Sequence, residues 1–216
     1  MIAAAGVALV LASILLVVLL LQQPGDNSVD AGFARDMSEH HGQAVALSME
    51  ALQDSKSPDV DVLAYDIATT QSNQIGRMQS WLLAWDLPNA RTGDRMAWMP
   101  HSMSMSDGTD MDMAMPQAQP GSADYRAMPG MATLAEMEEL DSLKGEEAEV
   151  LFLQLMITHH LAGADMAQAA VDEADEPEVV QLAESMVVGQ RAEIDLMASM
   201  LEDRGAAPRE DLPALD

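Results

Sequence analysis

Apolar residues recur every three to four positions from Phe33 to Leu82, which is the spacing of one face of a helix. They form two runs: Phe33, Met37, Ala44 and Leu47, then Leu63, Ile67, Ile75, Met78 and Leu82. The polar stretch Asp54 to Pro58 separates the runs, and proline suits the first turn of a new helix. The pattern therefore predicts a hairpin of two helices within residues 30–86.

The same pattern returns after a shift of 119 residues. The shift places Phe33 on Phe152, Met37 on Met156, His40-His41 on His159-His160, Pro58 on Pro177, Gln71 on Gln190 and Met78 on Met197. It needs no insertion across either helix, and similarity in one register over two helices indicates a duplicated structural unit. A second hairpin is therefore predicted within residues 145–205, followed by a tail at 206–216.

Two hairpins that each carry an apolar stripe can bury those stripes by packing together. The predicted fold is therefore all-α, a four-helix bundle made of two duplicated helical hairpins. The connection between the hairpins, residues 87–144, is rich in Pro, Gly, Ser, Asp and Met. It lacks periodicity, which predicts irregular structure. Only its end, Leu134 to Leu143, has the pattern of a short amphipathic helix.

The chain begins with an uncharged apolar run from Ile2 to Leu21. These 20 residues are long enough to span a bilayer as a helix. The run ends at Gln22-Gln23-Pro24 without the small-x-small cleavage site of a signal peptide. We therefore expect residues 1–23 to be a transmembrane anchor or an uncleaved signal, with the bulk of the chain on the extracytoplasmic or periplasmic side. A cleaved secretory signal is the alternative and gives the same compartment.

The composition excludes several classes of function. The 36 acidic and 10 basic residues leave a formal net charge of −26, which opposes binding to nucleic acid or to anionic lipid headgroups. The sequence contains no Cys, so a thiol nucleophile, a zinc-thiolate site and a disulfide framework are all excluded. Methionine, by contrast, is abundant at 19 residues. Soft-metal ligation in this chain must therefore use thioether and imidazole groups.

The duplicated motif Met-x-x-His-His carries the first candidate metal ligands. Neighbouring helical residues point about 100° apart, so His40 and His41 lie on the two flanks of the inward stripe. Met37 lies one turn earlier and reaches the same level of the helix. The duplicated set is His159, His160 and Met156. Because neighbouring histidines diverge, two separate sites and one shared site at the approximate two-fold axis remain alternatives.

Each hairpin places further candidates opposite these histidines. They are Met78 and Gln71 in the first hairpin and Met197 and Gln190 in the second; the second hairpin adds the unduplicated Met166, on the histidine helix itself and level with Met186. Thioethers and imidazoles without thiolate match copper, as Cu(I) or Cu(II), better than Zn, Mg or Ca. Methionines on such a stripe also fill cores. The two glutamines are either buried packing groups or hydrogen-bond partners of the histidines.

The linker between the hairpins holds a second group of candidates. It contains Met96, Met99, Met103, Met105, Met111, Met113, Met115, Met128 and Met131, with His101 among them. The surrounding sequence is polar, so we expect that core packing does not explain these methionines. Met-x-Met spacing in a flexible acidic segment resembles copper-capturing tracts outside the cytoplasm, and a low-complexity linker is the alternative. We predict loose, rapidly exchanging copper capture in this segment.

These motifs resemble a known bacterial family, domain of unknown function 305. The matching segments are Phe33-Ala-Arg-Asp-Met-Ser-Glu-His-His41, Met128-Pro-Gly-Met131, Phe152-Leu-Gln-Leu-Met-Ile-Thr-His-His160, Gln71-x-x-x-Ile75-x-x-Met78 and Gln190-x-x-Glu-Ile194-x-x-Met197. The resemblance extends from Asp30 to Arg204 and implies a ferritin-like four-helix architecture. Some members of the family are periplasmic copper-binding proteins linked to copper tolerance, so the resemblance also implies copper binding. Leu47 departs from the family, which often has Met there, as this chain has at Met166.

The combined expectation is a copper-binding protein outside the cytoplasm that acts as a chaperone or buffer in copper homeostasis or delivery. No enzyme activity is predicted, because the chain lacks the Glu-x-x-His motifs of a di-iron bundle and offers no nucleophile on a sharp turn. The alternative is an accessory structural subunit of a membrane complex, such as a copper-dependent respiratory oxidase. In that alternative the buried histidines are free of metal.

Overall fold

The computed structural model describes residues 23–91, 93–99 and 127–209. Its helices, in chain order, are α2 (Val29–Asp54), α3 (Pro58–Ala84), α4 (Leu134–Ser142), α5 (Glu146–Glu173) and α6 (Pro177–Asp203). No strand occurs in these described ranges. The prediction of an all-helical bundle is confirmed, and α4 occupies the segment in which a short helix is predicted.

Local sequence signals set where the helices begin. Ser28 caps α2, because its hydroxyl accepts a hydrogen bond from the backbone amide of Ala31. Thr133 and Glu136 form a capping box at the start of α4, which satisfies two otherwise unpaired backbone amides. Helices α3 and α6 both begin at a proline, which has no amide to leave unpaired there. The first residue of α6 lies 119 positions after the first residue of α3, and their last residues have the same separation. The duplicated sequence pattern therefore folds into duplicated helices.

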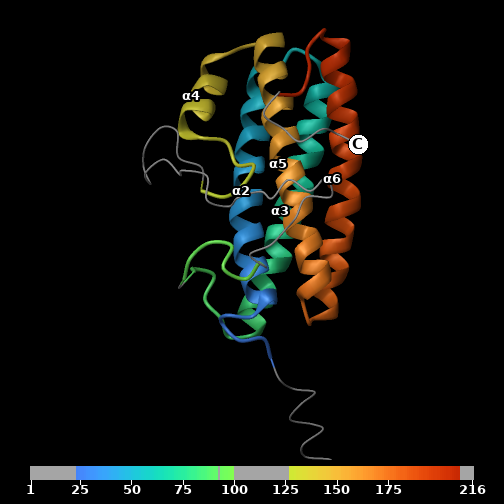
Figure 1. Cartoon of the computed structure of the whole chain (residues 1–216). Coiled ribbons are helices and arrows are strands. Elements are labelled where there is room, and N and C mark those ends of the chain that lie inside the picture. The colour runs from blue at the N-terminus through green and yellow to red at the C-terminus, as the bar shows by residue number, and fades with distance from the viewer. Residues whose placement is uncertain (1–22, 92, 100–126, 210–216) are drawn as a thin grey trace, which may run out of the picture.

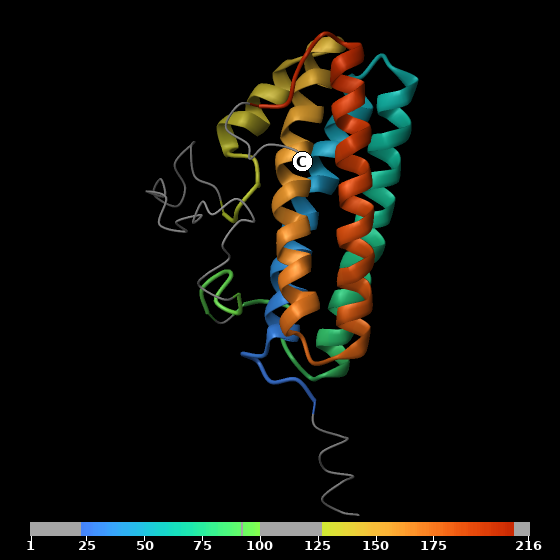
Figure 2. The ribbon, with the colours of Figure 1, turned by 45° about the vertical axis from the view of Figure 1, so that its right-hand side comes forward.

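The four long helices lie side by side, and α4 covers one side of the bundle where α2 and α5 meet (Figures 1 and 2). Helix α2 packs along α3, α5 packs along α6, and the two hairpins meet chiefly through α2 and α5. These two helices run antiparallel. The amide of Gly145, just before α5, donates to the carbonyl of Asp54 at the end of α2, and the amide of Glu176, just after α5, donates to Asp30 at its start. Equivalent residues of the two repeats therefore meet only near the middle of the bundle.

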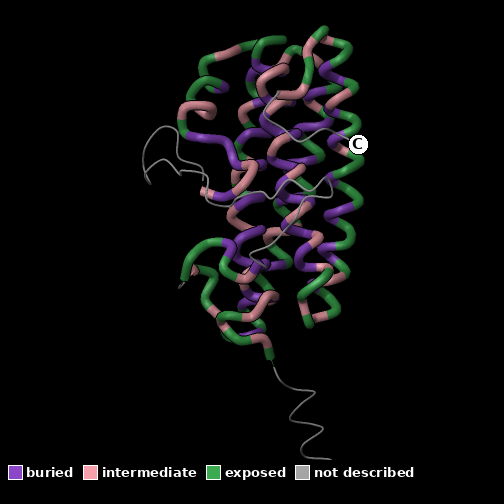
Figure 3. Tube along the Cα trace, in the orientation of Figure 1, coloured by how far each residue is buried: buried purple, intermediate pink, exposed green. Residues whose placement is uncertain are grey.

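The core divides into two clusters of buried side chains on the inward faces of the helices (Figure 3). We call the first the methionine cluster, and its largest members on the four long helices are Phe33, Met37, Met78, Leu82, Met166, Leu182 and Met186. We call the second the aliphatic cluster, and its members on those helices include Leu47, Leu63, Ile67, Phe152, Met156, Ile194, Met197 and Leu201. The antiparallel arrangement separates repeat-related residues, so Met37 and Met156 lie in different clusters.

One face of α2 holds both ends of the linker. Asp36 is fully buried and accepts hydrogen bonds from the backbone amide of Met96 and from the indole of Trp98, each at 2.8 Å, and it pairs with the guanidinium of Arg91. Two turns further along α2, Gln43 exchanges two hydrogen bonds with the backbone of Ala132, at 2.9 and 2.6 Å. The linker therefore leaves and returns to the bundle along the same helix.

Four of the linker methionines belong to the core. Met96, Met99, Met128 and Met131 are between 2% and 9% exposed and pack in the methionine cluster. The expectation that core packing does not explain the linker methionines is therefore wrong for these four. The physical reason is that polar side chains of α2 hold the irregular linker backbone against the bundle. Its methionines then fill gaps beside Phe33 and Trp98, whose rings meet edge to face at 5.7 Å.

In the part of the chain that the structure describes, no helix has the length and hydropathy needed to cross a membrane. The apolar run that predicts the anchor lies outside the described residues.

Candidate metal centre

The four histidines of the duplicated motif lie together in the middle of the bundle, on α2 and α5. All four are at most 1% exposed. The rings of His40 and His159 face each other across the two helices, with centroids 3.7 Å apart and planes tilted by 36°. Within each pair the rings are further apart, at 6.4 Å for His40 and His41 and 6.2 Å for His159 and His160. The histidines therefore form one layer in which the central pair, His40 and His159, is flanked by an outer imidazole on each side.

Three of the four imidazoles have a hydrogen-bond partner. Nε2 of His159 donates to the backbone carbonyl of His40 at 3.0 Å. Nε2 of His41 lies 2.8 Å from the side-chain oxygen of Gln74 on α3. Nε2 of His160 donates to the carboxylate of Glu193 on α6 at 2.7 Å. These bonds orient the outer rings and leave their Nδ1 atoms buried.

Several imidazole nitrogens are buried without a hydrogen-bond partner among the described residues. They are the Nδ1 atoms of His41 and His160 and the ring nitrogens of His40, which lie near the backbone of Pro129. A buried polar atom without a partner costs about 1–3 kcal/mol. Such atoms in a native protein call for an explanation, and a ligand ion is one of the few that apply. Buried imidazole nitrogens without a hydrogen-bond partner fit the donor set that a soft or borderline metal ion requires.

Burial favours the neutral form of three of these imidazoles, His40, His41 and His159. Burial lowers the pKa of His40 to about 3, and it does so although the nearby carbonyl of Pro129 opposes the shift. Burial likewise lowers the pKa of His41 to about 3, with the neighbouring charge of His40 acting in the same direction. Burial also holds the pKa of His159 well below its usual value, again with the charge of His40 contributing. A metal ion binds the neutral imidazole. At neutral pH it would therefore meet little competition from protons for these three groups.

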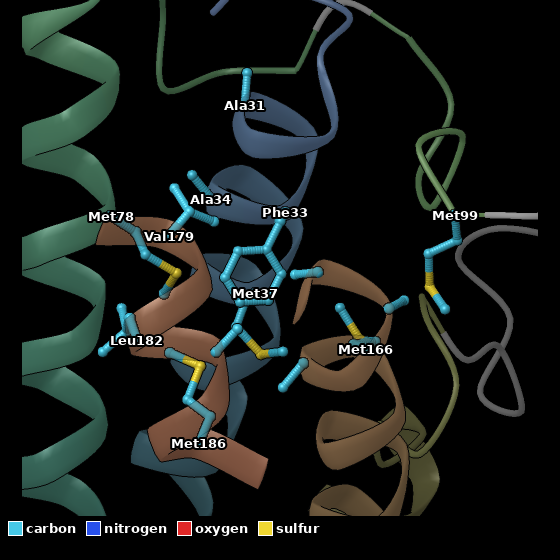
Figure 4. Close-up of a cluster of buried hydrophobic side chains, with 14 of the residues drawn as sticks. Ala31, Phe33, Ala34, Met37, Met78, Met99, Met166, Val179, Leu182 and Met186 are labelled. Atoms are coloured by element: carbon cyan, nitrogen blue, oxygen red, sulfur yellow. The ribbon is translucent and has the colours of Figure 1, made fainter. Parts of the chain in front are cut away.

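The predicted thioether ligands divide between the two ends of the histidine layer. Met37, Met78 and Met166 lie in the methionine cluster, together with Met186. Figure 4 shows their sulfur-bearing ends near Phe33, in the space between α2, α3, α5 and α6. Met156 and Met197 lie in the aliphatic cluster at the other end. Of the two clusters beside the histidine layer, the one near the start of α2 therefore contains more of these methionines. The reason is that Leu47 and Ile67 occupy the positions that Met166 and Met186 have in the second repeat.

The two glutamines predicted as partners of the histidines do not bond to them. The side-chain oxygens of Gln71 and Gln190 are buried and have no hydrogen-bond partner among the described residues. The observed partners, Gln74 and Glu193, lie three residues later, which is almost one turn. A signal for them was available: His41 and His160 sit on the flank of the inward stripe, so their partners belong on the flank of the neighbouring helix as well.

The turn Met128 to Met131 packs directly against α5 beside His159. Gly130 has a φ of +73°, and a Cβ atom at this position would lie 2.5 Å from Cβ of Ala162 and 2.7 Å from the carbonyl oxygen of Thr158. Only glycine fits this close approach. The turn covers the histidine layer on the side away from α3 and α6.

We expect Gly130→Ala to lower the free energy of unfolding by roughly 2 kcal/mol, because the left-handed backbone and the contact with α5 both disfavour a methyl group. Gly76→Ala is the matched control, since Gly76 lies within α3 with no atom near the added methyl group. This control should gain roughly 0.5–1 kcal/mol through helix propensity. Urea unfolding followed by circular dichroism measures both changes. Equal stability of the Gly130 variant and the native protein would contradict the packing of this turn.

The remaining candidates in the linker are His101, Met103, Met105, Met111, Met113 and Met115, and they lie outside the described residues. The structure therefore bears on the linker candidates only at its two ends, where Met99, Met128 and Met131 are core residues.

Across the described ranges, His, Asp and Glu side chains do not form a group of three or more that is placed to hold a metal ion. The arrangement offers instead mixed ligation by imidazole nitrogen and thioether sulfur. This donor set suits copper and other soft ions and not Mg²⁺ or Ca²⁺.

Together these features define a class: an antiparallel four-helix bundle, built by duplication, with a buried histidine layer between a methionine cluster and an aliphatic cluster. The chain belongs to the DUF305 family, a domain of unknown function, whose model matches residues 30–201. No curated protein matches the chain.

Solved structures of the same fold support this assignment. A DUF305 protein from Streptomyces coelicolor, described as secreted, has 41% identity and a TM-score of 0.72, with 86% of this chain and 99% of that chain covered. A DUF305 fragment from Deinococcus radiodurans has 31% identity and a TM-score of 0.62, covering 81% and 96%. CopM in its Cu(I)-bound form has 21% identity and a TM-score of 0.57, covering 81% and 96%. CopM has also been solved in Cu(II)-bound and Ag-bound forms.

Proposed function

We propose that this protein binds copper outside the cytoplasm and acts as a chaperone or buffer in copper homeostasis or delivery, without catalytic activity of its own. One observation carries the proposal. His40, His41 and His160 present buried ring nitrogens that no described group satisfies, in a layer that adjoins a cluster of thioethers. Leaving such atoms unpaired is costly, and copper offsets that cost with ligands it prefers.

The residues that would hold copper are the unpaired imidazoles, joined by the nearest thioethers. On α2, Met37 lies one turn before His40 and His41, and on α5 Met156 has the same relation to His159 and His160. When bound, copper would supply a transferable soft ion with two accessible oxidation states. The chain buries these imidazoles and lowers the pKa of His40, His41 and His159, which favours the neutral form that binds a metal.

Two relatives support the location and the metal. CopM, which shares the fold, was solved with copper and with silver, and silver is a close mimic of Cu(I). The Streptomyces coelicolor relative is described as secreted. We propose the same side of the membrane for this chain, with the apolar run from Ile2 to Leu21 as its anchor or leader.

Copper titration of the purified full-length protein tests the proposal. Cu(I) is titrated against a competing chelator, for the native protein and for a variant with His40, His41, His159 and His160 replaced by Ala. We expect saturable binding by the native protein and clearly weaker binding by the variant. Circular dichroism shows whether the variant remains folded, and single replacements of His41 and of His160 by Ala provide milder alternatives. Absence of saturable binding by the native protein would overturn the proposal.

The linker methionines require a separate test. Replacing Met103, Met105, Met111, Met113 and Met115 with Leu removes the thioethers and leaves the four buried linker methionines in place. We expect the tight sites to be unchanged and a weaker, rapidly exchanging fraction of Cu(I) to be lost. An unchanged total stoichiometry would show that this segment is only a connection.

One observation favours the alternative function, an accessory subunit of a membrane complex such as a copper-dependent oxidase. Three of the histidines already have protein hydrogen-bond partners, as structural histidines do. Affinity purification through a C-terminal tag from native membranes distinguishes the two functions. A stable complex that persists in the four-histidine variant, together with no copper in the purified native protein, would favour the accessory role.

A further inference from the structure

The two outer histidines of the layer are related by the duplication, but their hydrogen-bond acceptors differ in chemistry. His41 contacts the amide of Gln74, and His160 contacts the carboxylate of Glu193. Gln74 and Glu193 occupy the same position of the repeat, on α3 and α6. Both contacts use Nε2 of the ring and have nearly the same length, 2.8 and 2.7 Å. The two outer histidines therefore make equivalent contacts that differ in the acceptor, an amide for His41 and a carboxylate for His160.

An amide and a carboxylate constrain an imidazole differently. An ionised carboxylate only accepts hydrogen bonds, so Nε2 of a neutral His160 must carry the proton and its Nδ1 must present a lone pair. A glutamine amide accepts through its oxygen and donates through its nitrogen after a half turn of the amide group. In the structure the amide oxygen faces Nε2 of His41, and a half turn of the amide would let His41 adopt the other tautomer. We call His40 and His41 the first half of the layer and His159 and His160 the second half. Of the two outer histidines, only His160, in the second half, has an acceptor that fixes its tautomer.

The Nδ1 atom of His160 that would carry this lone pair is buried and has no described hydrogen-bond partner. The ring is fully buried, whereas the Glu193 side chain is 28% exposed and reaches in from the surface of α6. A carboxylate bonded to the far nitrogen of a histidine orients the ring and raises its basicity as a metal ligand. Glu193 also adds a negative charge that Gln74 lacks, and this charge favours the more highly charged metal ion.

We propose that Glu193 is a positioning residue that sets His160 as an Nδ1 ligand and makes the second half of the histidine layer the preferred site for Cu(II). The first half of the layer contacts the uncharged side chain of Gln74 and has no corresponding preference for Cu(II) over Cu(I). The statement about the metal rests on the proposed copper function. The statement about the tautomer of His160 does not, and it is tested without metal.

The first experiment is nitrogen-15 NMR of the histidine rings in the full-length, metal-free protein at pH 8. We expect His160 to show a protonated Nε2 and an unprotonated Nδ1. In Glu193→Gln this single form should give way to a mixture, and in Gln74→Glu His41 should become locked as His160 is in the native protein. A native His160 with a protonated Nδ1, or an unchanged tautomer in Glu193→Gln, would overturn the assignment of Glu193.

The second experiment is titration of the same proteins with Cu(II), and separately with Cu(I), against competing chelators. Glu193→Gln should weaken Cu(II) binding by roughly 10–100-fold, as loss of a group that supports a ligand typically does, and Cu(I) binding by clearly less. Glu184→Gln is the matched control, because it removes the same charge from an exposed position of α6 and should change neither affinity. Equal losses for both ions, or equal effects of the two variants, would overturn the Cu(II) preference.

The two experiments separate the two levels of failure. If the native protein binds neither ion while His160 shows the expected tautomer, the proposed function and the Cu(II) preference both fail. If the native protein binds copper but Glu193→Gln changes neither the tautomer nor the affinities, the copper function stands and the role of Glu193 is wrong.

Discussion

The metal-free protein should lose about 4 kcal/mol of its free energy of unfolding between pH 7 and pH 5 through His40 and His41 alone. Both have a pKa of about 3 in the folded protein, against an ordinary value of 6.5. Below pH 6.5 the unfolded chain therefore binds protons that the folded protein does not. The free energy of unfolding is therefore not reduced by these two histidines above about pH 6.5, and it falls progressively as the pH drops from there towards 3. His159 adds a loss in the same direction.

Urea unfolding at several pH values, in the presence of a chelator, measures this dependence. Replacing His40 or His41 with Gln removes one titrating group, so each replacement should reduce the slope near pH 5.5 by about 1.4 kcal/mol per pH unit. The window above pH 5 is informative because the carboxylates with lowered pKa, such as Glu39 and Glu149, affect stability only below their ordinary value of 4.5. A stability that is constant from pH 7 to pH 5 would contradict the buried, neutral histidine layer.

Asp36→Ala should lower the free energy of unfolding by about 3 kcal/mol. The Asp36 side chain is fully buried and holds the guanidinium of Arg91, the amide of Met96 and the indole of Trp98. Removing the carboxylate leaves a largely buried cation and two N–H groups without their acceptor. The linker can partly release from α2, which limits the loss to the lower part of the range for broken buried ion pairs.

Glu39→Ala is the matched control for Asp36→Ala. Glu39 pairs with the same Arg91, and with Arg95, but its side chain is 36% exposed. Solvent screens such a pair, so the control should cost less than about 1 kcal/mol. Urea unfolding followed by circular dichroism compares the two variants, and tryptophan fluorescence reports on Trp98. If both variants lose the same stability, the linker is not held by the buried contact with Asp36.

The sequence predicts the helices well because their signals are local. Period and proline placement are properties of neighbouring residues, and both repeats carry them. Helices α3 and α6 accordingly begin at Pro58 and Pro177, as the duplicated break in the pattern predicts. The likeness of the two repeats also identifies His40 and His159 as equivalent residues, since it depends only on the order of the amino acids.

The contacts of the site are less predictable, because they depend on how distant helices pack. The stacking of His40 on His159 follows from the antiparallel packing of α2 and α5, which periodicity does not specify. Gln74 and Glu193 become histidine partners through the rotation of each helix about its axis. The apolar stripe shows which face of a helix points inward, but it does not define the rotation closely enough to choose between neighbouring positions. For this reason the pattern favours Gln71 and Gln190 as histidine partners, although the observed partners are Gln74 and Glu193.

The features of this protein therefore divide by the range of the interactions that set them. The sequence by itself determined the helical class, the duplication and the presence of buried imidazole and thioether groups without thiolate, since composition and helical period depend only on residue type and order. The tertiary structure alone decided which histidines meet, which acceptor each one has, and that Met96, Met99, Met128 and Met131 fill the core. Those features arise from contacts between segments far apart in the chain, whose geometry is set by packing and not by local pattern.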